Sequence, residues 1–174
     1  MKKHFLLFLV FIFSIVLSAC TEEKTMPQSI EIEVDHSSYT GPLPTVQVYS
    51  GETPASIVVG NSCWGENGEP CTIDSQDPDA LLEEVSTSRA LLGEDLFFAL
   101  SASNIEREKH LLNTEDIHFE VTQFHKGEEK KLEVGGPTFK SPEEPGLYRY
   151  LATLTWEGET KGQANFAFSF SFTE

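Results

Sequence analysis

The chain has 174 residues, of which 28 are acidic and 12 are basic, and its formal net charge is −16. Nucleic-acid binding needs a basic footprint, and no basic cluster here supplies one, so nucleic acid is excluded as the expected partner. An acidic surface keeps a domain soluble and leaves cationic partners open.

Residues 1–19 have the features of a bacterial export signal. Two lysines precede an apolar run from Phe5 to Leu17, which is short for a membrane span, and a serine and an alanine stand before Cys20. Residues 17–20 resemble the lipobox of bacterial lipoproteins, in which the signal is cleaved before the cysteine and the thiol receives a diacylglycerol. We therefore expect a lipoprotein anchored through Cys20 to the extracytoplasmic face of the cell membrane.

The residues after the lipidated cysteine divide into a tether and a domain. Residues 20–29 are polar, lack periodicity, and would reach at most about 30 Å when extended. Residues 30–174 are enough for one domain with its own core, which needs no cofactor to fold. The tether is short, so the domain is expected to stay close to the membrane.

Segments with alternating or continuous apolar character recur along the domain between turn signals. Such a series predicts a strand-rich, all-β chain. The predicted strands are Ile30–Val34, Val46–Tyr49, Ser56–Gly60, Leu96–Leu100, Ile117–Phe124, Lys131–Val134, Leu147–Trp156 and Asn165–Phe172.

A short helix is expected over Asp77–Val85. Asp77 can cap its N-terminus, Pro78 suits the first turn, and an apolar stripe follows at Leu81, Leu82 and Val85. Residues 104–116 are charged, and a helical turn or an inter-strand loop fits them equally well.

The last two predicted strands carry the clearest pattern. In Asn165–Phe172 every second residue is phenylalanine, and in Leu147–Trp156 the aromatic and aliphatic residues alternate in the same way, so each strand has one core-facing side. Glu157–Gly162 supplies the glycines and polar residues that a hairpin between the two strands requires.

The entry to the first of these strands resembles a feature of immunoglobulin-like sandwiches. Pro145-Gly146-Leu147-Tyr148 is similar to the corner before a late strand, where a tyrosine hydroxyl bonds back to the upstream backbone. Tyr150 stands where the immunoglobulin pattern would have a cysteine, so no inter-sheet disulfide is expected. The predicted fold is an immunoglobulin-like antiparallel β-sandwich with one short helix.

With Cys20 assigned to the lipid, Cys63 and Cys71 are left to form one disulfide, which an extracytoplasmic location permits. The spacing predicts a hairpin that pairs Trp64 with Pro70, around a three-residue loop in which Gly68 takes the left-handed position. Trp64 is expected to be at least partly buried. This cystine hairpin is either a structural staple, a recognition surface with Trp64, Glu66 and Asn67 as candidate contacts, or a redox switch.

Two stretches of the chain resemble a group of uncharacterised lipoproteins from Bacillus-type Gram-positive bacteria. The first runs from Gly60 through Cys63-Trp64 and Cys71 to Pro78-Asp79-Ala80-Leu81-Leu82, and the second is the ending, with Pro145–Tyr148, Trp156 and Lys161–Phe168. The resemblance implies an envelope location and assigns no activity, so it transfers no catalytic residue.

No recognised catalytic or metal-binding motif occurs in the chain. Asp74, Asp77 and Asp79 lack the spacing of a calcium-binding loop, and the histidines, including His36, His110, His118 and His125, lack paired metal spacing. We therefore expect a non-enzymatic binding module of the bacterial envelope, without metal or cofactor, whose partner is an envelope protein or a cationic molecule. The alternatives are a protease-inhibitor-like module that inserts the Trp64 hairpin, and an envelope enzyme without a known motif.

Overall fold

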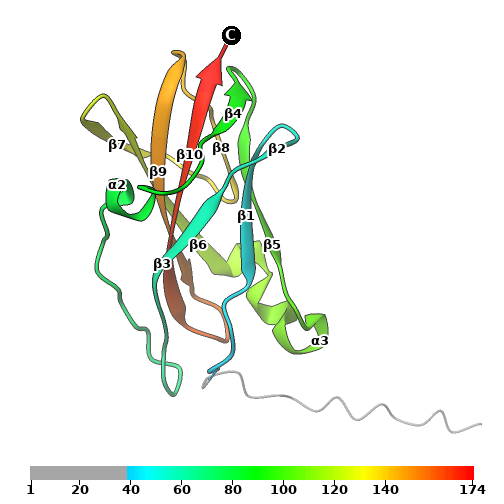
Figure 1. The fold of residues 1–174 in the computed structure, drawn as a ribbon. Coiled ribbons are helices and arrows are strands. Elements are labelled where there is room, and N and C mark those ends of the chain that lie inside the picture. Colours follow the sequence, from blue (N-terminus) through cyan, green and yellow to red (C-terminus); the bar gives the residue numbers. More distant parts are fainter. Residues whose placement is uncertain (1–38) are drawn as a thin grey trace, which may run out of the picture. The chain divides into compact units, whose positions relative to one another are not determined.

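The computed structural model describes residues 39–174. The predicted signal, Cys20, the tether, the strand expected at Ile30–Val34 and His36 lie outside the described residues. Residues 39–174 form two antiparallel sheets that pack face to face (Figure 1), which confirms the predicted β-sandwich.

The smaller sheet has four strands in the order β2-β1-β5-β8. Its longest members, β1 and β5, pair antiparallel along their whole length, and the flanking strands have two residues each. The bounds are Thr45–Ser50 for β1, Thr53–Pro54 for β2, Leu96–Ser101 for β5 and Thr138–Phe139 for β8.

The larger sheet has six strands, with the order β3-β10-β9-β6-β7 and with β4 placed parallel to β10. The predicted hairpin β9–β10 is present, and it lies at the centre of this sheet. The bounds are Ile57–Trp64 for β3, Ser88–Leu91 for β4, Ile117–His125 for β6, Glu128–Leu132 for β7, Gly146–Trp156 for β9 and Gly162–Thr173 for β10. The predicted strand Lys131–Val134 is therefore shifted, since β7 begins earlier and ends at Leu132.

Helical structure is confined to short turns. α2 (Pro78–Leu81) begins as predicted, with the Asp77 carboxylate accepting from the Asp79 amide, but it ends four residues before the expected Val85. The ambiguous residues 104–116 contain α3 (Ile105–Glu108) and two 3₁₀ turns, η1 (Lys109–Leu111) and η2 (Thr114–Asp116).

Six of the strands are arranged as in an immunoglobulin-like sandwich, whereas β3 and β4, which flank β10, are additional to that pattern. β6, β9 and β10 correspond to the C, F and G strands of one sheet, and β1, β5 and β8 correspond to A, B and E of the other. The expected tyrosine corner is present, because the Tyr148 hydroxyl donates to the Glu144 carbonyl oxygen at 3.0 Å.

Aromatic side chains fill the space between the sheets. The four phenylalanines of β10 (Phe166, Phe168, Phe170 and Phe172) are at most 1% exposed. Tyr150 of β9 stacks on Phe168 at 5.0 Å between ring centroids, and Phe98 of β5 meets Phe168 edge to face. Ring packing thus joins the two sheets.

The opposite face of β10 is also buried, although its sequence is mostly polar. Asn165 and Ser169 are 1% and 3% exposed, because residues 65–87, here called the cover segment, lie over them. Asn165 donates to the Asp74 carbonyl oxygen and accepts from the Thr153 hydroxyl.

The neighbouring amide of Gln163 repeats this arrangement. Its oxygen accepts from the Ile73 amide at 3.0 Å, and its NH2 group donates to the Thr155 hydroxyl. Farther along, Leu82 of the cover segment packs against Leu151 and Ala167. Amide hydrogen bonds and a small apolar cluster therefore hold the cover segment on β9 and β10.

Replacing Tyr150 with Phe is expected to stabilise the domain. The Tyr150 hydroxyl is fully buried without a hydrogen-bond partner, and burial raises the pKa of this phenol, so it remains protonated. Removal of an unsatisfied buried hydroxyl should raise the free energy of unfolding by about 1 kcal/mol, measured by urea denaturation.

Tyr148→Phe is the matched control, because its hydroxyl does donate to Glu144. This variant should lose about 1 kcal/mol of stability. A loss of stability in Tyr150→Phe would mean that its hydroxyl has a partner.

Candidate functional site

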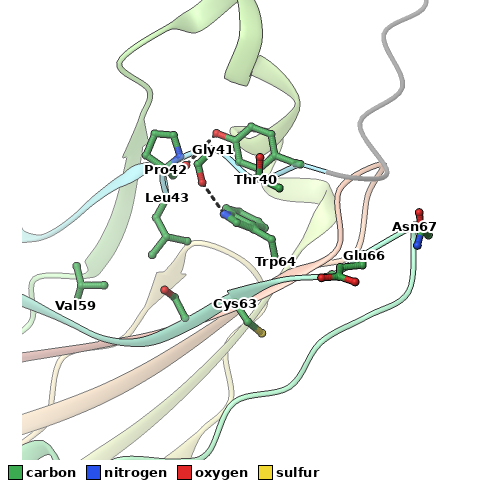
Figure 2. Close-up of a pocket in the computed structure, with 12 residues that line it drawn as sticks. Thr40, Gly41, Pro42, Leu43, Val59, Cys63, Trp64, Glu66 and Asn67 are labelled. Atoms are coloured by element: carbon green, nitrogen blue, oxygen red, sulfur yellow. Dashed lines mark hydrogen bonds between the residues drawn. The ribbon is translucent and has the colours of Figure 1, made fainter.

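A groove of about 900 Å³ opens along one edge of the sandwich. One wall is residues 39–43, which lead into β1, and the other is the inner side of β3 with the start of the cover segment. Figure 2 shows Leu43 and Val59 at one end of the groove, with Glu66 and Asn67 at the other. Val59 is 53% exposed although it is aliphatic.

Trp64 forms the floor of the groove and is partly buried, as expected. Its indole lies edge to face against Tyr39 at 5.1 Å and contacts Trp156 at 5.2 Å between ring centroids. The indole N–H donates to the Gly41 carbonyl oxygen at 2.9 Å (Figure 2). A Cβ atom on Gly162 would lie 2.1 Å from the indole, so glycine is required where Trp64 crosses β10.

Tyr39 fixes the wall opposite β3. Its hydroxyl donates to the Pro42 carbonyl oxygen at 3.0 Å. Burial raises the pKa of Tyr39, and the Glu108 carboxylate adds to this effect, so the hydroxyl remains a donor. Residues 39–43 are thus held by one hydrogen bond of their own and one from Trp64.

The predicted disulfide is present between Cys63 and Cys71, whose Cα atoms are 6.3 Å apart. The predicted ladder of the cystine hairpin is wrong, because residues 69–71 form no strand and β3 pairs with β10 instead. Trp64 lies opposite Gly162, and Cys63 opposite Gln163. The disulfide therefore ties the cover segment to β3.

The loop tip differs in detail from the predicted turn. Gly68 has the expected left-handed conformation (φ 77°), and Asn67 before it is also left-handed (φ 52°). The Glu69 amide donates to the Glu66 carbonyl oxygen at 3.0 Å, which places both left-handed residues at the centre of a turn of type I′ character. Glu66 and Asn67 are exposed at this tip, whereas Trp64 points inward.

The groove lies at the end of the sandwich where three connections meet. These are the cystine loop (residues 63–71), the β5–β6 connection containing α3, and the β9–β10 turn (Figure 1). The Trp156 indole donates to the Leu111 carbonyl oxygen, and the Glu157 amide donates to that of Asp116. Immunoglobulin variable domains carry their antigen-binding loops at the corresponding end.

β3 is an edge strand, and its edge is open at one end. Ser62 pairs with Ala164 and Val59 with Phe166, so Gly60 and Asn61 form a bulge opposite Asn165. The Asn61 amide at this bulge donates to the Gln76 side chain at 2.5 Å.

Beyond the bulge, the backbone alternates toward and away from β10. The Gly65 amide donates to the Lys161 carbonyl oxygen at 2.8 Å. Hydrogen-bonded pairs alternate with non-bonded pairs in an antiparallel ladder, so the next hydrogen-bonded residue after Gly65 is Cys63, opposite Gln163. The N–H and C=O groups of Ser62 and Trp64 therefore point away from β10. These groups lie at the free edge of the sheet.

The remaining candidate ligands do not converge. Within residues 39–174, no group of three or more histidine, cysteine or acidic side chains is placed to hold a metal ion. Asp77 caps α2, and Asp79 pairs with Arg149 at 3.2 Å. His118 is exposed on β6, and His125 stacks on Tyr148. In the same part of the chain, no helix has the length and apolar character needed to cross a membrane.

Sequence reasoning missed the wall of the groove at residues 39–43, and it missed Val59 and Ser62. Pro42 and Pro44 indicate only an irregular segment, and Val59 belongs to a run that predicts a strand without showing which edge is free. Only the order of strands in the assembled sheet identifies these residues.

Comparison of the chain with protein-family models, with curated proteins and with solved structures finds no match.

Proposed function

We propose that the protein is a non-enzymatic, lipid-anchored binding module on the extracytoplasmic face of the bacterial cell membrane. The proposal of location rests on the export signal and the lipobox cysteine, Cys20. The resemblance to lipoproteins of Bacillus-type bacteria supports the same location.

The observation that carries the binding role is the groove beside the cystine loop. It is open, its floor is a fixed Trp64, and it lies at the loop end that immunoglobulin domains use for recognition. Its ionisable side chains are the hydroxyl of Tyr39, which is already bonded, and the carboxylate of Glu66 at the rim. A binding surface needs no acid–base pair, and these two groups do not form one.

The geometry does not favour the protease-inhibitor-like alternative, in which Trp64 would be the inserting side chain. The indole is held between Tyr39 and Trp156 and bonded to Gly41, so it is not available to a partner's pocket. The exposed candidates at the loop tip are Glu66 and Asn67.

The binding role can be tested with a photo-crosslinking amino acid at Ser62, which is exposed beside the groove. We expect irradiation of cells that express the lipidated protein to give a discrete crosslinked product. The control position is Leu91 of β4, which is exposed and pairs with Thr173 at the other end of β10. Equal crosslinking from both positions, or none from either, would contradict a binding role for the groove.

Cys20→Ser is expected to release the protein from the membrane. Without a thiol, no diacylglycerol can be attached, and the remaining acidic domain has little affinity for anionic lipid. Fractionation of cells should move the variant from the membrane to the soluble extracytoplasmic fraction, with Cys63→Ser as a control that stays in the membrane. Retention of fully processed Cys20→Ser in the membrane would contradict lipid anchoring.

A further inference from the structure

We infer that the groove takes a short, extended, basic peptide segment, which adds as a strand to the open end of β3. This inference rests on the proposed binding role and specifies the chemistry of the partner. Three independent features of the described residues support it: the free edge of β3, the apolar end of the groove, and the distribution of charge around it.

The first feature is that β3, apart from its bulge, carries none of the charged side chains that usually protect an edge strand. The opposite edge of the same sheet, β7, has the sequence Glu-Glu-Lys-Lys-Leu, and such charges discourage strand addition. β3 has the sequence Ile-Val-Val-Gly-Asn-Ser-Cys-Trp, without any charged residue. Its bulge and Gln76 close the edge at Asn61, which leaves Ser62 and Trp64 to pair with a short segment.

The second feature is the apolar end of the groove. Leu43 and Val59 lie there and line the groove (Figure 2). A strand paired with Ser62 and Trp64 would direct alternate side chains into the groove and toward the opposite face of the sheet. An aliphatic side chain of the partner would therefore cover Val59, which is more than half exposed.

The third feature is the charge of the cover segment, residues 65–87, which has seven acidic residues and no lysine or arginine. Glu66 belongs to this segment and lines the groove. Lys161, which lies beside Gly65, directs its ammonium group to the Glu157 carbonyl oxygen. At the opposite wall, Tyr39 feels one charge of each sign, from Glu108 and Arg107. The acidic rim at Glu66 therefore attracts a basic segment, while a second copy of this acidic chain would be repelled.

The inference can be tested with a labelled peptide of alternating lysine and valine, titrated against the purified domain and followed by fluorescence anisotropy. We expect saturable binding that weakens with added salt, and no binding of the copy in which glutamate replaces lysine. Two further copies are N-methylated at every second residue, in opposite phases. In an extended peptide, the amides of every second residue point to the same side, so only one of the two sets can bond to β3. The copy in which that set is methylated should fail to bind.

Variants locate the site. Val59→Asn should weaken binding of the lysine–valine peptide about tenfold, and Leu91→Asn, at a strand residue of similar exposure, should not. Glu66→Lys should weaken it about threefold, and Glu129→Lys on β7 should not. Melting temperatures of all four variants verify that they are folded.

The outcomes separate this inference from the proposed function. Equal binding of the basic and acidic peptides would overturn the charge requirement, and equal binding of both N-methylated copies would overturn strand addition. If no peptide binds while Ser62 still crosslinks in cells, the groove binds a partner of another chemistry, so the inference fails and the binding role stands.

Discussion

Replacing Trp64 with Ala is expected to lower the free energy of unfolding by about 3 kcal/mol. The indole packs against Tyr39 and Trp156 and donates to Gly41, so truncation leaves a cavity and an unpaired carbonyl. Because Trp64 is only partly buried, the effect should lie at the lower end of the range for a large aromatic residue. Thermal unfolding should show a decrease in melting temperature of about 10 °C.

Trp64→Phe separates packing from hydrogen bonding. A phenyl ring keeps part of the contact with Tyr39 and Trp156 but has no N–H group for Gly41, so this variant should lose clearly less stability than Trp64→Ala. If Trp64→Ala melted at the wild-type temperature, the indole would not belong to the core. The hypothesis of an exposed Trp64 anchor would then regain its support.

The double variant Cys63→Ser, Cys71→Ser is expected to lose about 2.5 kcal/mol of stability, by the chain-entropy model for so short a loop. The disulfide joins β3 to the cover segment, and its removal frees the start of that segment. Intact mass with and without reductant checks the bond, and melting with and without reductant checks its effect. A melting temperature unchanged by reduction would contradict a stabilising role.

The disulfide and the amide of Asn165 hold the same segment, so their contributions should not be additive. Asn165→Ala leaves the Asp74 carbonyl and the Thr153 hydroxyl without their partner. A double-mutant cycle that combines Asn165→Ala with removal of the disulfide should show an interaction energy between about 0.5 and 3 kcal/mol. Strict additivity would mean that the two attachments act on independent parts of the cover segment.

The centre of the fold could be predicted from sequence because its information is local. Alternation along β9 and β10 identifies the strands and their core face, and the short polar turn between them fixes their pairing. The Pro-Gly-Leu-Tyr entry predicts a bond from the Tyr148 hydroxyl to the upstream backbone, and the bond to Glu144 that forms spans only four residues.

The cystine hairpin shows why local information can also mislead. A turn at Asn67-Gly68 between two nearby cysteines fits a hairpin, and the disulfide does form. The strand partner of Cys63 is nevertheless Gln163, which is distant in the sequence. A disulfide brings two residues together but does not require their backbones to form a ladder.

The second face of β10 shows a different limit. Asn165 and Ser169 alternate with phenylalanines and therefore resemble the solvent side of a strand. They are buried because their polar groups bond to the Asp74 carbonyl and the Thr87 hydroxyl of the cover segment. Such compensation depends on a connection whose path no periodicity reveals, and the groove at residues 39–43 escaped prediction for the same reason.

The position of β10 in its sheet has a consequence for the order of folding. Among the described strands, β3 and β4 pair only with β10, although both precede it by many residues in the chain. Until β10 has been synthesised, neither strand has a sheet to join, and such distant pairings form slowly. The larger sheet therefore cannot be completed until the final strand of the described residues is available.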